Sequence, residues 1–262
     1  ASTHDGRWEK SRFMGMEITG KILGIIGCGN IGSVVADRAQ GLKMKIIGYD
    51  PFMSLERANA LGIEKVDLQD LYRRADFISL HTPLTDATRN IINASAIENM
   101  KDGVRLINCA RGGLIVEKDL KEAILSGKVA GAGIDVFESE PARENELFGL
   151  EKVVATPHLG ASTTEAQEKV AVQIAEQMSD YLTTGAVTNA LNMPSVSSEE
   201  APKLKPYMKL AEQLGSFAGQ ATQSAYKAIK IEYKGLVADR NTKPITAVIL
   251  KGLLAPLMEG VN

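Results

Sequence analysis

The sequence predicts an α/β fold, a doubly wound parallel sheet followed by a partial α+β unit. Short apolar runs rich in Ile and Val alternate with longer amphipathic runs between residues 18 and 160. A glycine-rich stretch, GCGNIG, follows the first of these runs at 27–32, and an acid, Asp50, ends the second. Strand–helix alternation with continuous apolar strands is typical of a parallel sheet that has helices on both faces.

The apolar runs are expected to be buried strands, because strands of a parallel sheet are covered on both faces. They lie at 21–27, 44–50, 76–81, 104–109, 130–136 and 152–158, with a short edge strand at 64–67. Between them, apolar residues recur three and four positions apart, which indicates helices. These helices are expected at 31–40, 55–61, 68–74 and 117–126.

Beyond residue 160 the pattern changes. A long helix is expected at 164–183, with Thr163 as its N-cap and Gly185 as its stop. The segment 192–206 contains three prolines and is predicted to be a linker. A helix at 209–220, a half-exposed antiparallel strand at 226–235 and a helix at 250–258 interrupted at Pro256 are expected to follow.

The composition argues against several classes of partner. The net charge is −2, which gives no general attraction to nucleic acid or to an anionic membrane, and no apolar run reaches the roughly 18 residues of a membrane span. Cys28 and Cys109 form no metal-ligand spacing and are typical of reduced thiols in a cytoplasmic protein. The three histidines, His4, His81 and His158, are too scattered to indicate a metal site.

The glycine stretch fits the pattern G-x-G-x-x-G between a strand and a helix, the setting in which this pattern binds a dinucleotide. Gly27 would allow the tight turn, Gly29 the close approach of a pyrophosphate, and Gly32 the packing of helix on strand. Asn30 and Ile31 open the helix, whose N-terminal amides favour phosphate. The sequence therefore predicts a Rossmann-type dinucleotide-binding domain, with a purely structural glycine turn as the alternative.

Asp50 ends the second strand 18 residues after Gly32. A carboxylate there accepts hydrogen bonds from the ribose hydroxyls on the adenine side of the cofactor and repels a 2′-phosphate. Pro51, and not an arginine, follows it. The prediction is therefore NAD in preference to NADP, and the alternative is that Asp50 is a solvated cap.

Later strand ends carry further candidates for chemistry. Arg111 in NCARGG (108–113) is suited to bind a carboxylate through two parallel hydrogen bonds, or to form a surface ion pair. His158 in TPHLGAST (156–163) is a candidate proton acceptor, and Glu140 in GIDVFESEP (133–141) could fix its tautomer. A structural histidine and a solvated acid are the alternatives for these two residues. Thr82 is expected near the nicotinamide end of the cofactor, where His81 is a weaker candidate.

GCGNIG, Asp50, HTPLT, NCARGG, GIDVFESEP and TPHLGAST, in this order, resemble the NAD-dependent D-2-hydroxyacid dehydrogenases over residues 1–192. The resemblance implies that the catalytic residues are Arg111, Glu140 and His158. It also implies that His158 accepts the proton of the substrate hydroxyl while a hydride passes to the nicotinamide. Glu140 orients His158, and Arg111 holds the substrate carboxylate.

The same resemblance implies the contacts of the cofactor. Asp135 would bind the nicotinamide amide, and the backbone of Cys109 and Ala110 would lie along the cofactor. The full set of residues expected to contact NAD is Gly27, Gly29, Asn30, Ile31, Gly32, Asp50, Thr82, Cys109, Ala110, Arg111, Asp135, His158, Gly160 and Ala161.

The C-terminal third resembles the members of this family that oxidise 3-phospho-D-glycerate to 3-phosphohydroxypyruvate, the first step of the phosphorylated route to serine. This implies a dinucleotide-binding domain at 1–163, a crossover helix and return segment toward a substrate domain at 164–195, and the incomplete start of an intervening or regulatory domain at 196–262. The N-terminal part of the substrate domain would be missing, so the chain is expected to be a fragment, and activity is expected of the longer protein. Trp8 lies in a region that helps form a dimer in the family, so a homodimer or homotetramer is expected.

Three alternatives remain open from the sequence. The chain could belong to another D-2-hydroxyacid dehydrogenase, such as a glyoxylate or hydroxypyruvate reductase. It could be an NAD-sensing binding module of the same fold. It could also be a dimerisation scaffold with a vestigial site, although all three implied catalytic residues are present.

Overall fold

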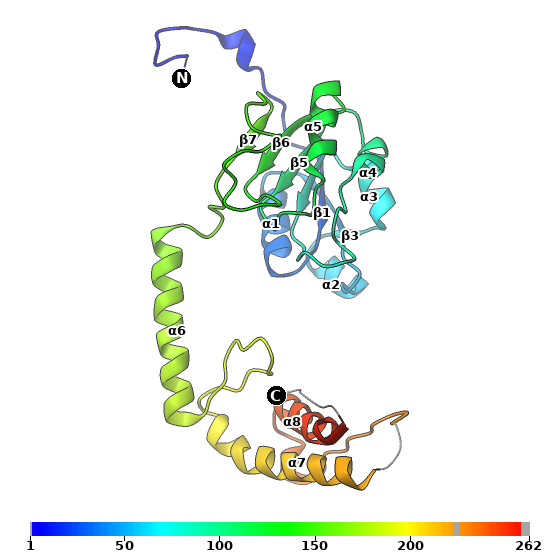
Figure 1. The fold of residues 1–262 in the computed structure, drawn as a ribbon, viewed down its shortest axis with the longest axis vertical. Helices are drawn as coiled ribbons and strands as arrows, with labels where there is room; N and C mark the ends of the chain where they lie inside the picture. Colours follow the sequence, from blue (N-terminus) through cyan, green and yellow to red (C-terminus); the bar gives the residue numbers. More distant parts are fainter. Residues whose placement is uncertain (1, 223–225, 258–262) are drawn as a thin grey trace. The chain divides into compact units, whose positions relative to one another are not determined.

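The computed structural model describes residues 2–222 and 226–257. The chain divides into two compact units, Ala1–Ser162 and Thr163–Asn262 (Figure 1). The first unit is built on a seven-stranded sheet with the strand order β3-β2-β1-β4-β5-β6-β7, in which every neighbouring pair is parallel. The strands are β1 (Ile22–Ile26), β2 (Lys45–Tyr49), β3 (Glu64–Lys65), β4 (Phe77–Leu80), β5 (Val104–Asn108), β6 (Val129–Ile134) and β7 (Val153–Ala155).

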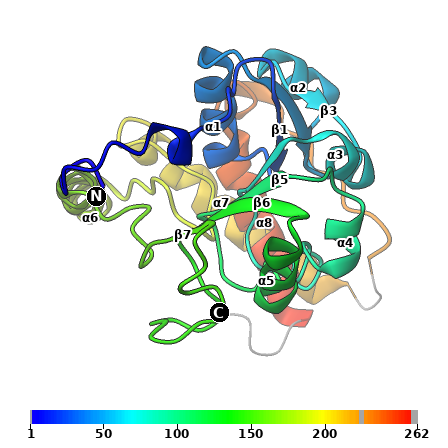
Figure 2. The same ribbon diagram turned by 90° about the horizontal axis from the view of Figure 1, so that it is seen from above.

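Helices cover both faces of this sheet. They are α1 (Asn30–Gly41), α2 (Leu55–Ala60), α3 (Leu68–Arg74), α4 (Ala94–Glu98) and α5 (Glu117–Ser126), and a 3₁₀ turn, η1 (Lys10–Phe13), precedes them. Successive residues of β2, Ile46 and Ile47, belong to two separate apolar clusters, because side chains of a strand alternate between its faces. One cluster includes α1 and α2, and the other includes α3, α4 and α5. Figure 2 shows α1 and α5 on opposite sides of the strands.

The doubly wound parallel sheet predicted from the sequence is therefore confirmed. Each strand predicted for this sheet is present, although β7 is only three residues long. The sequence analysis missed α4, a helix of five residues whose N-cap, Asn93, accepts a hydrogen bond from the amide of Ala96. A single apolar pair, Ala96 and Ile97, is too short a pattern to show a period of 3.6 residues.

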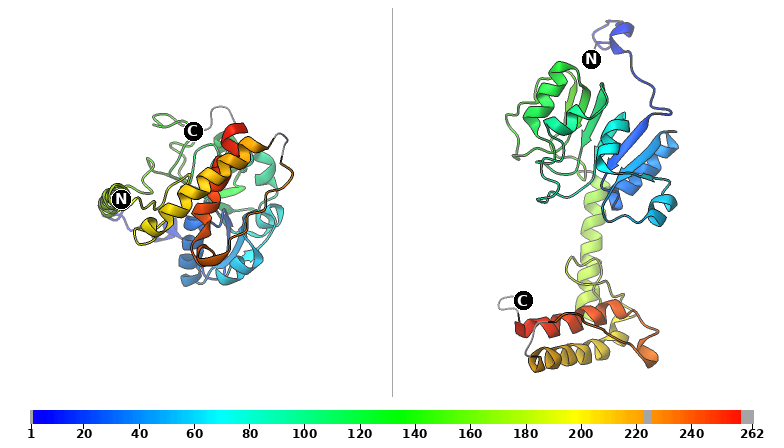
Figure 3. Two further views of the ribbon diagram at one scale, coloured as in Figure 1. Left: turned by 90° about the horizontal axis from the view of Figure 1, so that it is seen from below. Right: turned by 90° about the vertical axis from the view of Figure 1, so that its right-hand side faces the viewer.

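In the part of the second unit that the structure describes, the regular elements are helices, and Val187 and Val196 form an isolated antiparallel bridge. The helices are α6 (Thr164–Thr184), α7 (Ala201–Ala221), η2 (Gly235–Val237), α8 (Thr242–Leu254) and η3 (Ala255–Leu257). The predicted caps of α6 are confirmed: the Thr163 hydroxyl accepts a hydrogen bond from the amide of Ala166, and Gly185 is left-handed with φ 76°. Helices α7 and α8 lie side by side (Figure 3), where glycines allow the two backbones to meet.

Three expectations for this unit are wrong. The segment 192–206 is not all linker, because α7 already begins at Ala201, with Pro202 in its first turn, where proline is tolerated, and Pro206 inside the helix. The predicted strand at 226–235 is irregular chain that pairs with no strand of the described residues and runs into η2, and a strand without a partner is not stable. Helix α8 begins at Thr242 and not at residue 250, and the predicted end at 258 lies outside the described residues.

Two further observations limit the kinds of site that the described residues offer. No helix among them has both the length and the apolar character needed to cross a membrane. In the same ranges, 2–222 and 226–257, no three His, Cys, Asp or Glu side chains come together as metal ligands would.

Candidate active site

The carboxyl ends of all seven strands meet at one edge of the sheet, because the strands are parallel. The strand order reverses between β1 and β4, and the crevice at such a switch point is where ligands bind in this architecture. Every residue that the sequence analysis proposed for chemistry or cofactor binding lies in a loop at this edge or in the first turn of α1. The structure therefore brings the predicted set to one edge.

Of the three glycines of the GCGNIG motif, which forms the loop after β1 and the first turn of α1, only Gly29 has free space on the side where a side chain would lie. Gly27 has φ 91°, and a side chain there would press on the backbone of His81. A side chain on Gly32 would overlap the carbonyl oxygen of Gly27, so this glycine allows α1 to pack on the loop. At Gly29 a Cβ would meet no atom within 4 Å. The backbone is therefore open to an incoming group at Gly29, as the predicted roles require.

The N-terminus of α1 lacks a side-chain cap, as that of α5 also does, whereas three other helices of this unit are capped. The N-cap side chains of α2, α3 and α4 accept hydrogen bonds from the first turn of their helices. The N-cap of α1 is Gly29, which offers no such acceptor. The exposed Asn30 and Ile31 follow it, and Ile31 is 68% exposed. The first-turn amides of α1 thus have no side-chain cap, which fits the binding of a diphosphate.

The Asp50 side chain is hydrogen-bonded to the glycine loop after β1. Its Oδ2 accepts a hydrogen bond of 2.9 Å from the amide of Cys28, and its Oδ1 accepts one of 2.8 Å from the amide of Phe52. Burial, and next the charge of Asp50, raise the pKa of the Cys28 thiol to about 12, so the thiol stays protonated at neutral pH. The carboxylate therefore lies beside the glycine loop, where a ribose next to a bound diphosphate would reach it.

Arg111 is exposed in the loop after β5, and its Nη1 donates a 2.6 Å hydrogen bond to the carbonyl of Ala110. Asn108, which is buried, shapes this loop: its Oδ1 accepts from the amide of Ala110 and its Nδ2 donates to the carbonyl of Arg111. Gly112 follows, and any side chain on it would overlap the carbonyl of Phe137. The Arg111 loop thus packs directly on the loop that carries Glu140.

Asp135 is buried at the end of β6 and accepts three hydrogen bonds. They come from Thr156 Oγ1 at 2.6 Å and from the amides of Leu159 and Gly160 at 2.8 and 2.9 Å. Burial acts to raise its pKa, but these hydrogen bonds together outweigh burial and lower the pKa. Asp135 therefore holds the segment that contains His158 in place as a carboxylate.

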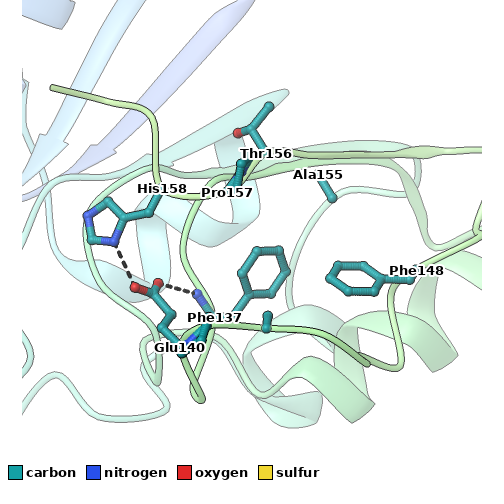
Figure 4. A pocket seen from close by; sticks show the side chains of 9 residues that line it. Phe137, Glu140, Phe148, Ala155, Thr156, Pro157 and His158 are labelled. Atoms are coloured by element: carbon teal, nitrogen blue, oxygen red, sulfur yellow. Dashed lines mark hydrogen bonds and ion pairs between the residues drawn. The ribbon is translucent and has the colours of Figure 1, made fainter. Parts of the chain in front are cut away.

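His158 and Glu140 form the central contact of the site. The Nδ1 atom of His158 lies 2.8 Å from Oε2 of Glu140, and Oε1 of Glu140 accepts a 3.0 Å hydrogen bond from the amide of Phe137 (Figure 4). The hydrogen bond with His158, and next that from Phe137, lower the pKa of Glu140. Glu140 is therefore ionised at neutral pH and accepts the Nδ1 proton, which leaves Nε2 of His158 as the basic atom.

A pocket of about 480 Å³ adjoins this pair. The rings of Phe137 and Phe148 meet edge to face in its wall, with centroids 5.4 Å apart. Pro141, Ala142, Ala155 and Pro157 also line it, so its wall is mainly apolar away from the histidine and the carboxylate.

The backbone of His158 is left-handed, with φ 55°, and its amide donates a hydrogen bond to the carbonyl of Asp135.

For the remaining predicted residues, all within the described part of the chain, the structure gives the location and exposure, but no hydrogen bond with the His158–Glu140 pair. Thr82 is half-buried after β4, while Cys109 is exposed after β5 and Ala161 is exposed in the loop after β7. His81 is not at the centre of the site: its Nε2 pairs with the Ser79 hydroxyl at 2.8 Å, and burial lowers its pKa.

The sequence analysis missed three residues that support the site, namely Asn108, Thr156 and Glu117. The position of Asn108, at the last residue of a strand and before an arginine loop, was the only signal that could have found one of them. The contacts of Thr156 and Glu117 join residues 21 or more apart in the sequence, which no local pattern reveals.

The sheet, the glycine loop and the His158–Glu140 pair are the features expected of a nicotinamide-dependent dehydrogenase. A family model described as "D-isomer specific 2-hydroxyacid dehydrogenase, NAD binding domain" matches residues 1–160. The chain belongs to this family of D-isomer specific 2-hydroxyacid dehydrogenases. A second model, "D-3-phosphoglycerate dehydrogenase intervening domain", matches residues 203–262.

The chain is similar to curated enzymes along its whole length. It is 46% identical to D-3-phosphoglycerate dehydrogenase of Methanocaldococcus jannaschii over 264 residues, which cover 100% of this chain and 50% of the relative. It is 42% identical to the enzyme of the same name from Bacillus subtilis, over 98% of this chain and 49% of the relative. The chain thus spans about half the length of the curated relatives it matches.

Solved structures agree on the fold. A glyoxylate reductase from Paecilomyces thermophila superposes with a TM-score of 0.65 at 35% identity, covering 71% of this chain and 57% of that one. The holo form of D-mandelate dehydrogenase from Rhodotorula graminis gives a TM-score of 0.67 at 31% identity, covering 75% and 60%. The predicted resemblance to the family is therefore confirmed.

Proposed function

We propose that the protein to which this chain belongs oxidises 3-phospho-D-glycerate to 3-phosphohydroxypyruvate with NAD. The observation that carries the proposal is the 2.8 Å contact of His158 Nδ1 with an ionised Glu140, which leaves a basic Nε2 at the ligand-binding edge of the sheet. The choice among 2-hydroxy acids is supported by the names of the relatives and by the match of residues 203–262 to the intervening domain.

The residues present fit NAD. The open backbone at Gly29 and the first turn of α1 without a side-chain cap fit its diphosphate. Asp50 fits the adenosine ribose and disfavours a 2′-phosphate. When bound, NAD supplies a nicotinamide ring that accepts a hydride.

In the proposed reaction, Nε2 of His158 takes the proton of the substrate hydroxyl as the hydride leaves C2. The Glu140 carboxylate stabilises the imidazolium that this step creates and keeps the ring in the Nδ1–H tautomer. Arg111 binds the substrate carboxylate through the guanidinium nitrogens that its bond to Ala110 leaves free. Asp135, with three acceptor sites already filled, keeps lone-pair capacity for the nicotinamide amide. The other proposed cofactor contacts are those of Gly27, Asn30, Ile31, Gly32, Thr82, Cys109, Ala110, Gly160 and Ala161.

The proposal extends to the setting of the reaction. It places the enzyme in the cytoplasm, at the first step of serine synthesis, as a homodimer or homotetramer without nucleic acid or membrane partners. The division into a dinucleotide-binding domain at 1–163, a crossover segment at 164–195 and the start of an intervening domain at 196–262 is part of the same proposal.

A substrate comparison on the full-length protein tests this function. NADH formation is measured with 3-phosphoglycerate and with glycerate, and NADH consumption with glyoxylate and with hydroxypyruvate. The proposal requires the highest kcat/KM with 3-phosphoglycerate. A higher kcat/KM with one of the other three substrates would assign the chain to another member of the family. Binding of NAD without turnover of any hydroxy acid would favour a sensing module.

A further inference from the structure

The loop that carries Glu140 lacks helix or strand over residues 135–152, between β6 and β7. Among the described residues its backbone–backbone hydrogen bonds are few: they lie at Asp135 and in the turns between residues 145 and 153, and none of them involves residues 136–144. Side-chain contacts therefore contribute to the position of the part that carries Glu140. A 1 Å displacement of Glu140 would lengthen its contact with His158 beyond hydrogen-bond range. The geometry of the catalytic pair therefore depends on what fixes this loop.

Glu117, in the first turn of α5, reaches across to the loop with both carboxylate oxygens. Its Oε1 accepts a hydrogen bond of 2.9 Å from the amide of Glu138, and its Oε2 accepts one of 2.6 Å from Nδ2 of Asn145. The Oδ1 of Asn145 in turn accepts from the amide of Leu147, whose side chain is buried. One carboxylate thus fastens the loop on both sides of Glu140.

Glu117 is itself well anchored. The segment before it, Leu114 and Ile115, is buried, and Ile115 pairs with Ile92 in an isolated parallel bridge. A carboxylate in the first turn of a helix is also favoured by the helix dipole. The same stretch of chain begins with Arg111, so one anchored element holds the arginine and fastens the glutamate loop.

The contacts from α5 to His158 are continuous. Glu138, whose amide Glu117 holds, is two residues from Glu140, and the amide of Phe137 beside it donates to Glu140 Oε1. Glu140 Oε2 then meets His158 Nδ1. We infer that Glu117 is a positioning residue, which keeps the Glu140 carboxylate directed at His158. This inference rests on the proposed function for its catalytic consequence, and its structural part can be measured without turnover.

The test measures the tautomer of the neutral His158 ring by two-bond ¹H–¹⁵N NMR on the 262-residue chain, with His158→Asn to assign the signals. The variants are Glu117→Ala and the milder Glu117→Gln, with Glu140→Gln as reference and the exposed Glu122→Ala on the same helix as matched control. An imidazole in water prefers the Nε2–H form, so the Nδ1–H form reports a glutamate in place. A loss of stability alone would not change the tautomer of the folded molecules.

We expect the Nδ1–H form in the unmodified chain and in Glu122→Ala, and the Nε2–H form in Glu140→Gln. Glu117→Ala shifts the ring toward the Nε2–H form, and Glu117→Gln, which keeps one acceptor, shifts it less. If Glu117→Ala does not fold, the shift in Glu117→Gln alone decides. A ring that stays Nδ1–H in whichever Glu117 variant folds would overturn the inference.

Kinetics of the full-length protein separate this inference from the proposed function. Glu117→Ala is expected to lower kcat by about 10- to 100-fold, as displaced catalytic groups do, with the KM for NAD changed less than about twofold. If the unmodified enzyme turns over no hydroxy acid while the tautomer still shifts, the proposed function fails and the positioning role of Glu117 stands. If kcat is unchanged in Glu117→Ala, the catalytic part of the inference is overturned.

Discussion

Asp50 and Cys28 are joined by a hydrogen bond of 2.9 Å from the Cys28 amide to the Asp50 carboxylate. This bond links the end of β2 to the glycine loop after β1, two neighbouring strands of the sheet. The group proposed to bind a ribose is thereby held beside the backbone proposed to bind a diphosphate. The two halves of the predicted motif, separated by 18 residues of sequence, thus form one connected surface.

The substitution Asp50→Asn tests the proposed preference for NAD. We expect the affinity for NAD to fall about 10- to 100-fold, since a hydrogen bond to a charged group is worth about 1.5–3 kcal/mol. The affinity for NADP should change little or rise, because the negative charge that repels its 2′-phosphate is gone. Calorimetric titration of both cofactors measures this, with Asp37→Asn on the exposed face of α1 as the control. An equal loss of affinity for NAD and NADP would contradict the assignment of Asp50.

The substitution His158→Asn separates proton transfer from cofactor binding. General acid–base catalysis contributes about 10²- to 10⁴-fold in rate, and kcat of the full-length protein should fall by at least that factor. The affinity for NAD should stay nearly unchanged. His4→Asn, at an exposed position near the N-terminus, serves as the control. A loss of NAD binding that matches the loss of kcat would count against the role in proton transfer.

Stability of the first unit should depend on pH through Asp135. Its pKa is lowered in the folded state, since its hydrogen bonds outweigh burial. A lowered carboxyl pKa adds stability that is complete above the unfolded value of about 3.9 and is lost as the pH falls through the folded value. In urea unfolding, the difference between the unmodified chain and Asp135→Asn should therefore be larger at pH 7 than at pH 3. A difference that is the same at both pH values, or an equal effect of the exposed Asp86→Asn, would contradict this account.

The sequence was sufficient to predict the sheet because its evidence is local. Each strand is a continuous apolar run, and the glycine spacing 27–29–32 marks the turn into α1. Residues 226–235 show where this reasoning fails. Their alternation of apolar and charged residues is a strand pattern, but a strand also requires a partner, and pairing is a property of the whole fold. The early start of α7 was missed because the three prolines of 192–206 were taken as the mark of a linker, although proline is tolerated in the first turn of a helix, where Pro202 lies.

In the site too, local sequence patterns were sufficient for some residues, whereas others depend on contacts made by the whole fold. Arg111, Glu140 and His158 were proposed because they lie in segments that follow strand ends and because together they resemble a known family. Asp135 was expected to touch a nicotinamide, but its contacts with Thr156, Leu159 and Gly160 also make it a support for the His158 loop. Contacts of this kind join residues that are distant in sequence, so they emerge only once the strands are placed beside one another.

Gly112 provides a last prediction, because the same substitution should have opposite effects at two glycines of the first unit. A methyl group on Gly112 would overlap the carbonyl of Phe137, so Gly112→Ala should destabilise the unit by about 1–3 kcal/mol, as overpacking does. Gly41, in the last turn of α1, has open space around it, and Gly41→Ala should stabilise by about 0.5 kcal/mol through helix propensity. Urea unfolding followed by circular dichroism measures both.

The Gly112 substitution should also lower kcat in the full-length protein, whereas Gly41→Ala should not, because only Gly112 lies where the Arg111 loop meets the Glu140 loop. Equal stability of the two variants would mean that the backbones at residues 112 and 137 separate without loss. That result would show that the close packing of the two loops does not determine the position of Arg111 relative to Glu140.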